Sequence, residues 1–142
     1  MSEFNFKSSV CTSIEQSKRL IALGLKKTTA DCVWIEMSKG DWRVDANGWK
    51  EYYSIVEEGI VPAWSLGRLV EDLMPEKIGE FDTLASLLVS KRKVQYYFHD
   101  VEYSEYLTSA GCWKGGDVYD NAIDCIEWLI KEGYFPEEYL DE

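Results

Sequence analysis

The sequence predicts a single α+β domain over residues 1–142, with a small, mostly antiparallel sheet packed against about three helices. Three segments carry helix caps and helical spacing of apolar residues, and the segments between them are rich in residues that favour strands. The chain has 142 residues, of which 46% are hydrophobic and 14% aromatic. A chain of this length and composition can bury a core without disulfides or metals.

The first helix is predicted to begin at the segment Thr12–Glu15. There the threonine hydroxyl and the glutamate carboxylate fit a capping box, which satisfies free amide groups at the start of a helix. The helix should run to about Leu23. Gly24 suits the left-handed residue that closes it, and Leu25 can then contact Leu20.

The second predicted helix is short and begins at Ser65, its N-cap, and Trp64, just before the cap, can pack on Leu69 as a hydrophobic staple. Its apolar residues follow the spacing of one face of an α-helix. These residues are Leu66, Leu69, Val70, Leu73 and Met74. Pro75 should end the helix, because the residue before a proline is disfavoured in helical conformation.

The third predicted helix follows Asp117, a good N-cap, and ends at Gly133. Trp128 and Ile130 widen its apolar face. The residues expected to form its buried stripe are Val118, Ala122, Cys125, Ile126 and Leu129, and those expected to face outward are Asp120, Asp124, Glu127 and Lys131.

Strand candidates lie between the helices. Cys32 to Met37 and Trp42 to Val44 could form a hairpin, with residues 38–41 as its turn. The other candidates are Val94 to His99 and Val101 to Leu107. For Leu84 to Val89 the pattern allows helix or strand, and periodicity does not decide between them. Residues 46–62 have weak periodicity and are expected to form a long, partly irregular connection.

The formal charge of −11 is concentrated towards the end of the chain, where only Lys114 and Lys131 are basic after residue 94. An acidic surface repels phosphates, so direct nucleic-acid binding is not expected. The same charge could suit a basic partner protein, or could serve solubility alone.

No apolar run reaches the roughly 20 residues that span a bilayer, and no secretory signal is recognisable, so we expect a cytoplasmic protein without membrane association. Cys11, Cys32, Cys112 and Cys125 form no CxxC pair. In this setting they are expected to be reduced, structural thiols.

No motif for catalysis, cofactor binding or metal binding is recognised, so no catalytic residue, cofactor or metal ligand is assigned. His99, the only histidine, would point away from Asp100 in a strand. Cys112 lies in a glycine-rich stretch that favours a tight loop before the last helix. A Cys112–His99 pair remains the one enzymatic alternative.

Aromatic residues supply a candidate partner surface. Aromatics in an irregular region either fill the core beneath a loop or form an exposed contact patch, and the sequence leaves both readings open. The residues concerned are Trp42, Trp49, Tyr52, Tyr53 and Trp113.

The chain resembles a family of small phage and mobile-element proteins of gut anaerobic bacteria, to which no activity is attached. The resemblance covers roughly a third of the chain in three blocks that coincide with the predicted helix caps and faces. The blocks are Thr12–Lys18 with Leu23–Leu25 and Thr29–Asp31; Pro62–Leu66 with Leu69 and Leu73–Pro75; and Ala122, Cys125, Ile126, Trp128–Leu129 and Gly133–Tyr134. The resemblance implies a genomic setting and carries over no functional residue.

Three functions are compatible with these observations. The first is a non-enzymatic interaction or accessory module of a phage or mobile element, acting on an unknown protein partner. The second is an acidic inhibitor that mimics nucleic acid and occupies the basic groove of a DNA- or RNA-binding protein. The third is an enzyme of unrecognised class that uses Cys112 and His99. The oligomeric state is not predicted.

Overall fold

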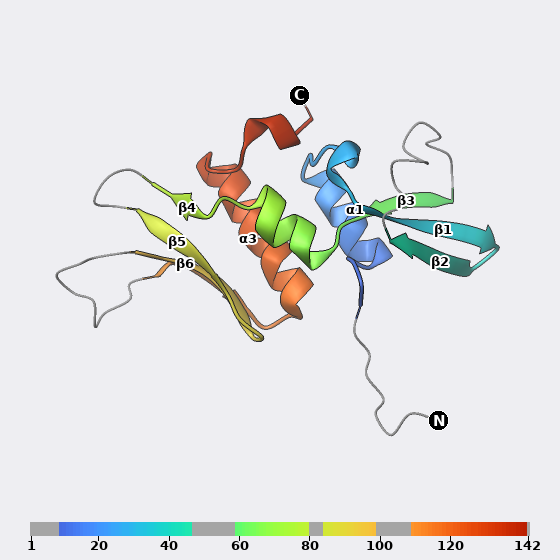
Figure 1. The fold of residues 1–142 in the computed structure, drawn as a ribbon, viewed down its shortest axis with the longest axis horizontal. Coiled ribbons are helices and arrows are strands. Elements are labelled where there is room, and N and C mark those ends of the chain that lie inside the picture. Colours follow the sequence, from blue (N-terminus) through green and yellow to red (C-terminus); the bar gives the residue numbers. More distant parts are fainter. Residues whose placement is uncertain (1–8, 47–58, 80–83, 99–108, 142) are drawn as a thin grey trace, which may run out of the picture.

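The computed structural model describes residues 9–46, 59–79, 84–98 and 109–141, and its middle layer of helices lies between two antiparallel sheets (Figure 1). Helix α3 packs against strands of one sheet, and helix α1 packs against the other. The α+β class is thus confirmed, with two sheets where a single one was expected. Across the described ranges, no helix has the length and apolar character needed to cross a bilayer.

The three-stranded sheet has the order β2-β1-β3, with β1 at Cys32–Ser38, β2 at Asp41–Ala46 and β3 at Ile60–Ala63. The β1–β2 hairpin confirms the predicted pair. Strand β3 lies where an irregular connection was expected, and Pro62 within it pairs with Val33. An edge strand tolerates a proline because its missing N–H can face away from the ladder.

The four-stranded sheet has the order β4-β5-β6-β7. Its strands are β4 at Lys77–Ile78, β5 at Ala85–Val89, β6 at Lys93–Phe98 and β7 at Ser109–Lys114. Strand β5 settles the choice left open for residues 84–89, and β6 confirms its predicted strand. The strand predicted for residues 101–107 lies outside the described residues.

Strand β7 corrects the expectation of a tight glycine-rich loop around Cys112. Gly111 lies opposite Tyr96 of β6, and the Trp113 ring folds back over it. A Cβ atom on Gly111 would lie 2.4 Å from the Trp113 ring. Gly111 is therefore present to make room for an aromatic ring and not to form a turn.

Helix α1 (Ile14–Ala22) has a capping box, but its cap is Ser13 and not Thr12 as predicted. The Ser13 hydroxyl accepts from the Gln16 amide at 3.1 Å, and the Gln16 side chain accepts from the Ser13 amide at 2.9 Å. Thr12 is buried, and its hydroxyl accepts from the Trp64 amide at 3.1 Å. A tertiary contact has taken the hydroxyl that the local pattern offered for capping.

The end of α1 is the predicted one. Gly24 has φ of 102°, which favours glycine. Its amide donates to Ile21, and the Leu25 amide donates to Leu20 at 3.2 Å, the two bonds of a Schellman ending. Leu20 and Leu25 are both fully buried.

The second helix is capped as predicted, because the Ser65 hydroxyl accepts from the Arg68 amide at 3.1 Å. Its body, η2 (Arg68–Leu73), is a π-helix and not the expected α-helix. Leu69, Leu73 and Met74 are nevertheless buried as predicted. A π-helix has a wider turn than an α-helix, and such turns are rare and often lie at functional sites.

Helix α3 (Val118–Glu132) begins at Asp117, whose carboxylate accepts from the Asp120 amide at 2.8 Å, and ends at Gly133, with φ of 77°. Its buried face is wider than the predicted stripe. It also includes Tyr119, Asn121 and Ile123. The reason is that α3 packs against β6 and β7 on one side and against α1 on another.

Two 3₁₀ helices, η1 (Lys27–Thr29) and η4 (Glu137–Tyr139), complete the described fold. The chain near residue 140 pairs with the turn after α1: Leu25 and Leu140 form a β-bridge, and the Lys26 amide donates to Tyr139 at 2.8 Å. The last described residues are thereby fixed against α1.

Ion pairs connect α1 to the outer face of α3. The Arg19 guanidinium contacts Asp124 at 2.6 Å and Glu127 at 2.8 Å. Lys131 adds a second cation to Glu127 at 3.4 Å. Hydrogen bonds from Arg19 and then Lys131 hold the pKa of Glu127 below its ordinary value.

This lowered pKa predicts a pH-dependent contribution to stability. Because the folded-state pKa lies below the unfolded one, the contribution is present above about pH 4.3, the ordinary pKa of glutamate, and is lost as the pH falls further. Glu127→Gln should cost less than about 1 kcal/mol at neutral pH, since the pair is partly exposed. Thermal unfolding of both proteins across this range should show the difference vanish in acid. The same difference for Glu132→Gln, at the exposed end of α3, would contradict this assignment.

Candidate functional site

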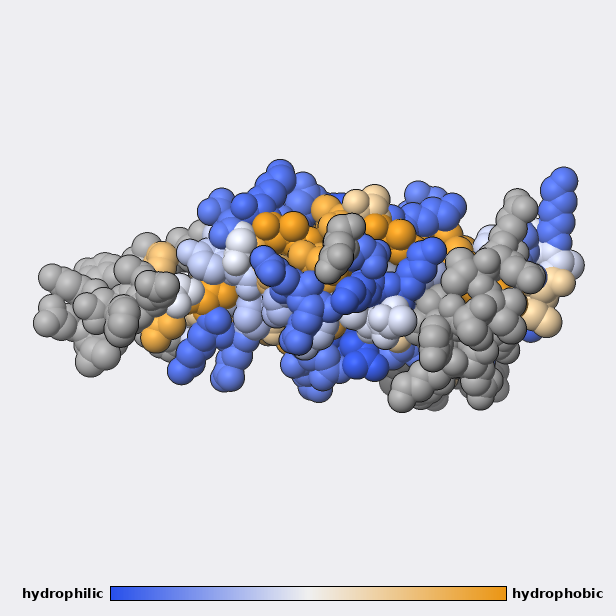
Figure 2. All heavy atoms as spheres, turned by 90° about the horizontal axis from the view of Figure 1, so that it is seen from above, coloured by the Kyte–Doolittle hydropathy of each residue, from blue (hydrophilic) through white to orange (hydrophobic). Residues whose placement is uncertain are grey.

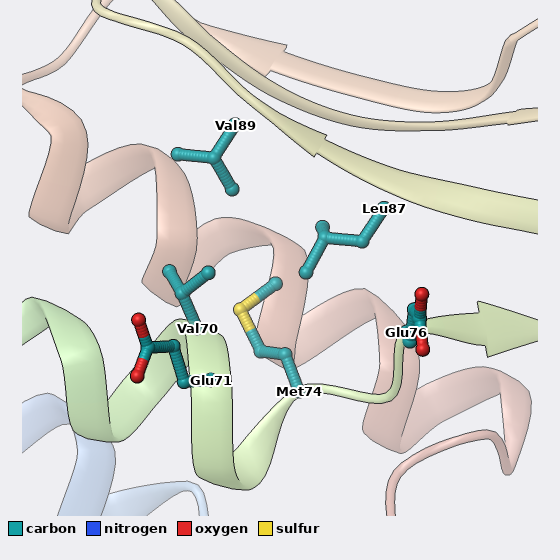
Figure 3. Close-up of a pocket in the computed structure, with 6 residues that line it drawn as sticks. All are labelled: Val70, Glu71, Met74, Glu76, Leu87 and Val89. Atoms are coloured by element: carbon teal, nitrogen blue, oxygen red, sulfur yellow. The ribbon is translucent and has the colours of Figure 1, made fainter.

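A cavity of about 400 Å³ opens between η2 and β5 (Figure 3). Its volume falls in the range of small-ligand and side-chain pockets, roughly 300–1,000 Å³. It is lined by Val70, Glu71, Met74, Glu76, Leu87 and Val89.

The two walls come from elements of different kinds. Val70 and Met74 lie on one side of the cavity, and Leu87 and Val89 face them from β5 (Figure 3). Leu87 and Val89 are alternate residues of one strand, so their side chains point to the same face of the sheet. The pocket thus lies where the π-helix and the inner face of the sheet meet without filling the space between them.

Hydrogen bonds fix the connection between the two walls. The Leu87 amide donates to the Glu76 carbonyl at 2.9 Å, and the Tyr96 hydroxyl donates to the Pro75 carbonyl at 2.6 Å. Burial raises the pKa of Tyr96 well above its ordinary value, so the hydroxyl keeps its proton. Met74 is buried at the base of this connection. These hydrogen bonds therefore hold in place the backbone that borders the cavity.

The chemistry of the lining is apolar with an acidic edge. Glu71 and Glu76 are exposed and flank the cavity on two sides (Figure 3). The other four lining residues are apolar, and the lining of this pocket contains no serine, cysteine or histidine. Such a pocket can bury an apolar group and attract a positive charge beside it.

Of the five aromatic residues predicted as a partner surface, the structure describes two. Trp42 lies in β2 and Trp113 in β7, in different sheets at opposite ends of the molecule, so these two do not form one patch (Figure 1). Trp49, Tyr52 and Tyr53 lie outside the described residues.

Trp113 takes part in packing between the sheet and α3. Its ring centroid lies 5.2 Å from that of Trp128, which in turn lies 6.3 Å from Tyr96 and 5.9 Å from Tyr134. Tilted pairs at these separations are favourable. Trp113 is half-buried against the main core, so at this residue the core-filling role is realised.

The alternative site at Cys112 and His99 is only half described. Cys112 is exposed on β7, opposite Gln95, and His99 lies outside the described residues. Within the described part of the chain, no group of three or more His, Cys, Asp or Glu side chains is placed to hold a metal ion.

Comparison with models of known protein families, with curated proteins and with solved structures found no match.

Sequence reasoning assigned part of the pocket to the core and did not recognise the pocket itself. The spacing predicts Val70 and Met74 on the apolar face of the second helix, and the structure shows Met74 buried and Val70 half-buried in the pocket lining. The opposing wall, formed by Leu87 and Val89, cannot be predicted, because the pattern of residues 84–89 allows helix or strand. Two glutamates on either side of Pro75 were the only local signal of the acidic edge.

Proposed function

We propose that the protein is a non-enzymatic interaction module that binds a partner protein through the pocket between η2 and β5. The observation that carries this proposal is a cavity with four apolar lining residues and two exposed carboxylates at its edge. The proposal includes an accessory role in a phage or mobile element, which rests on the sequence resemblance alone. It also includes a cytoplasmic location, which fits four cysteines held as thiols.

The partner expected from this chemistry presents an apolar side chain with a lysine or arginine next to it. The apolar side chain would enter between Val70 and Leu87, and its basic neighbour would lie near Glu71 or Glu76. The net charge of −11 would favour encounter with such a basic surface. Apolar residues gather over the middle of the molecule, bordered by hydrophilic ones, on the face seen in Figure 2.

Nucleic-acid mimicry has less support, because carboxylates of α3 are already engaged within the protein. Asp120 accepts from the Gln16 side chain at 2.8 Å, and Asp124 and Glu127 bind Arg19. A mimic must present its carboxylates to the basic groove of a partner protein. These three carboxylates would first have to break their hydrogen bonds and ion pairs with Gln16 and Arg19.

The proposal can be tested by selecting ligands from a library of random linear peptides on the immobilised protein. We expect the enriched peptides to carry an apolar residue next to lysine or arginine. Val70→Trp, which fills the cavity, should weaken their binding about tenfold or more, a loss of roughly 1.4 kcal/mol. Circular dichroism would first establish that the variant is folded.

Charge at the pocket edge has a matched control. Glu71→Lys with Glu76→Lys should weaken binding of the selected peptides. Glu137→Lys with Glu138→Lys makes the same change in net charge at exposed positions in η4, away from the pocket, and should leave this binding unchanged. Binding should weaken only slightly with salt, because burial of apolar area is little affected by it. Peptides that bind the cavity-filled variant as well as the wild type, or no enrichment, would refute the proposal. So would a steep loss of affinity with salt.

A further inference from the structure

Cys11 and Cys32 form a small apolar cluster of their own, apart from the main core. Each side chain is only 2% exposed, and the two lie together with Ala63 beneath the partly buried Trp34. The neighbouring Cys32 side chain raises the pKa of Cys11. Two cysteines that lie 21 positions apart in the sequence are thus packed in one buried cluster.

The backbone next to each cysteine is fixed against the end of β3. Beside Cys11, the Thr12 amide donates to the Trp64 carbonyl at 2.8 Å. Beside Cys32, the Asp31 amide donates to the Ala63 carbonyl at 3.2 Å. Because the two acceptors are consecutive residues, these hydrogen bonds hold the backbone beside both cysteines against the same point of the chain.

The indole of Trp34 closes the cluster from one side. Its N–H donates to the Thr12 carbonyl at 2.9 Å, which joins β1 to the segment that contains Cys11. The other two cysteines lie elsewhere: Cys125 is buried in α3, and Cys112 is exposed in β7. The geometry therefore distinguishes one pair among the four thiols.

We propose that Cys11 and Cys32 form a disulfide when the protein meets a disulfide oxidant such as oxidised glutathione. The thiolate of one cysteine attacks the oxidant, forms a mixed disulfide and releases one glutathione thiolate. The second cysteine thiolate then attacks the mixed disulfide and releases the other. Two electrons pass to the oxidant, and the two protons lost by the cysteines are taken up by the glutathione thiolates.

The bond would tether the segment before α1 to strand β1, which makes this pair a redox-sensitive modification site. It would also constrain the unfolded chain, because it closes the loop from residue 11 to residue 32. The neighbouring Cys32 side chain and then burial raise the pKa of Cys11, so the folded protein should react slowly, through brief openings of the segment around Cys11. This inference is independent of the proposed function, since none of its residues lines the pocket.

The test uses the full chain with Cys112→Ser, which removes the exposed thiol. The reduced protein is incubated with excess oxidised glutathione in a low concentration of urea, and its mass and tryptic peptides are then measured. We expect the mass to fall by two hydrogen atoms and a single cross-linked species to join the peptides of Cys11 and Cys32. The cross-linked protein should melt about 5–10 °C higher, and a reductant should reverse the gain.

Cys11→Ala and Cys32→Ala should each abolish the mass loss. The peptide map of the Cys112→Ser protein decides the matter even if these variants fold poorly. A cross-link that involves Cys125 would overturn the proposal, as would glutathione adducts without loss of hydrogen. A cross-linked protein that melts below the reduced one would also overturn it, because the bond would then not fit the native arrangement.

Discussion

Leu69→Ala is expected to lower the free energy of unfolding by about 2–5 kcal/mol. Leu69 is completely buried in η2 and belongs to the main hydrophobic cluster. Truncation removes apolar contacts and leaves a cavity that a close-packed core closes only in part. Thermal and urea unfolding of both proteins would measure the loss, with Tm falling by several degrees.

Glu71→Ala supplies the control, because this residue lies in the same helix and its side chain is exposed. Its effect should stay within about 0.5 kcal/mol, as is usual for surface positions. A Tm shift of less than a degree or two for Leu69→Ala would show that this face is not packed as described. Equal losses in both variants would indicate a general sensitivity of the π-helix and not burial of Leu69.

The features that sequence predicted well are those decided within a few residues. Gly24 and Leu25 close α1 as expected because a Schellman ending depends only on the local chain. Asp117 caps α3 for the same reason, since its carboxylate reaches an amide three residues away. The spacing of Leu69 and Leu73 likewise placed both in the core, although the helix that carries them has a different pitch.

The errors arose where a distant contact outweighed a local one. Thr12 and Ser13 both offer a hydroxyl at the start of α1, and only the position of Trp64, 52 residues after Thr12, decides between them. The cap of the second helix also has a distant partner. Ser65 is held by the Asp31 carboxylate through its amide at 2.8 Å and its hydroxyl at 2.5 Å, a contact that spacing within the helix cannot reveal.

The candidate site could be predicted only in part, because a pocket depends on how two elements pack against each other in the folded chain. The sequence placed Val70 and Met74 on an apolar face, but only the pairing of β5 with β4 and β6 brings Leu87 opposite them. Strand β7 was missed for a similar reason. Glycines in a sequence favour a turn, and the Trp113 ring that requires Gly111 becomes visible only in the folded sheet.

Trp64→Ala is expected to be the most destabilising single change in the described chain, at about 3–5 kcal/mol. Trp64 is completely buried between β3 and η2. Its amide and carbonyl both bond Thr12, and its indole N–H donates to the Thr29 hydroxyl at 2.9 Å. Loss of the side chain would leave a cavity where the segments that contain Thr12, Thr29 and Trp64 meet. Urea unfolding would measure the loss.

Trp64→Phe separates the ring from its hydrogen bond. Phenylalanine keeps most of the apolar volume but cannot donate to Thr29, so the cost should be less than half that of Trp64→Ala. A double-mutant cycle with Thr29→Val should give a coupling of about 0.5–1.5 kcal/mol, the usual net value of one hydrogen bond. A loss for Trp64→Phe as large as that for Trp64→Ala would contradict the assignment of most of the stabilisation to the apolar volume of the ring, because one hydrogen bond cannot account for it.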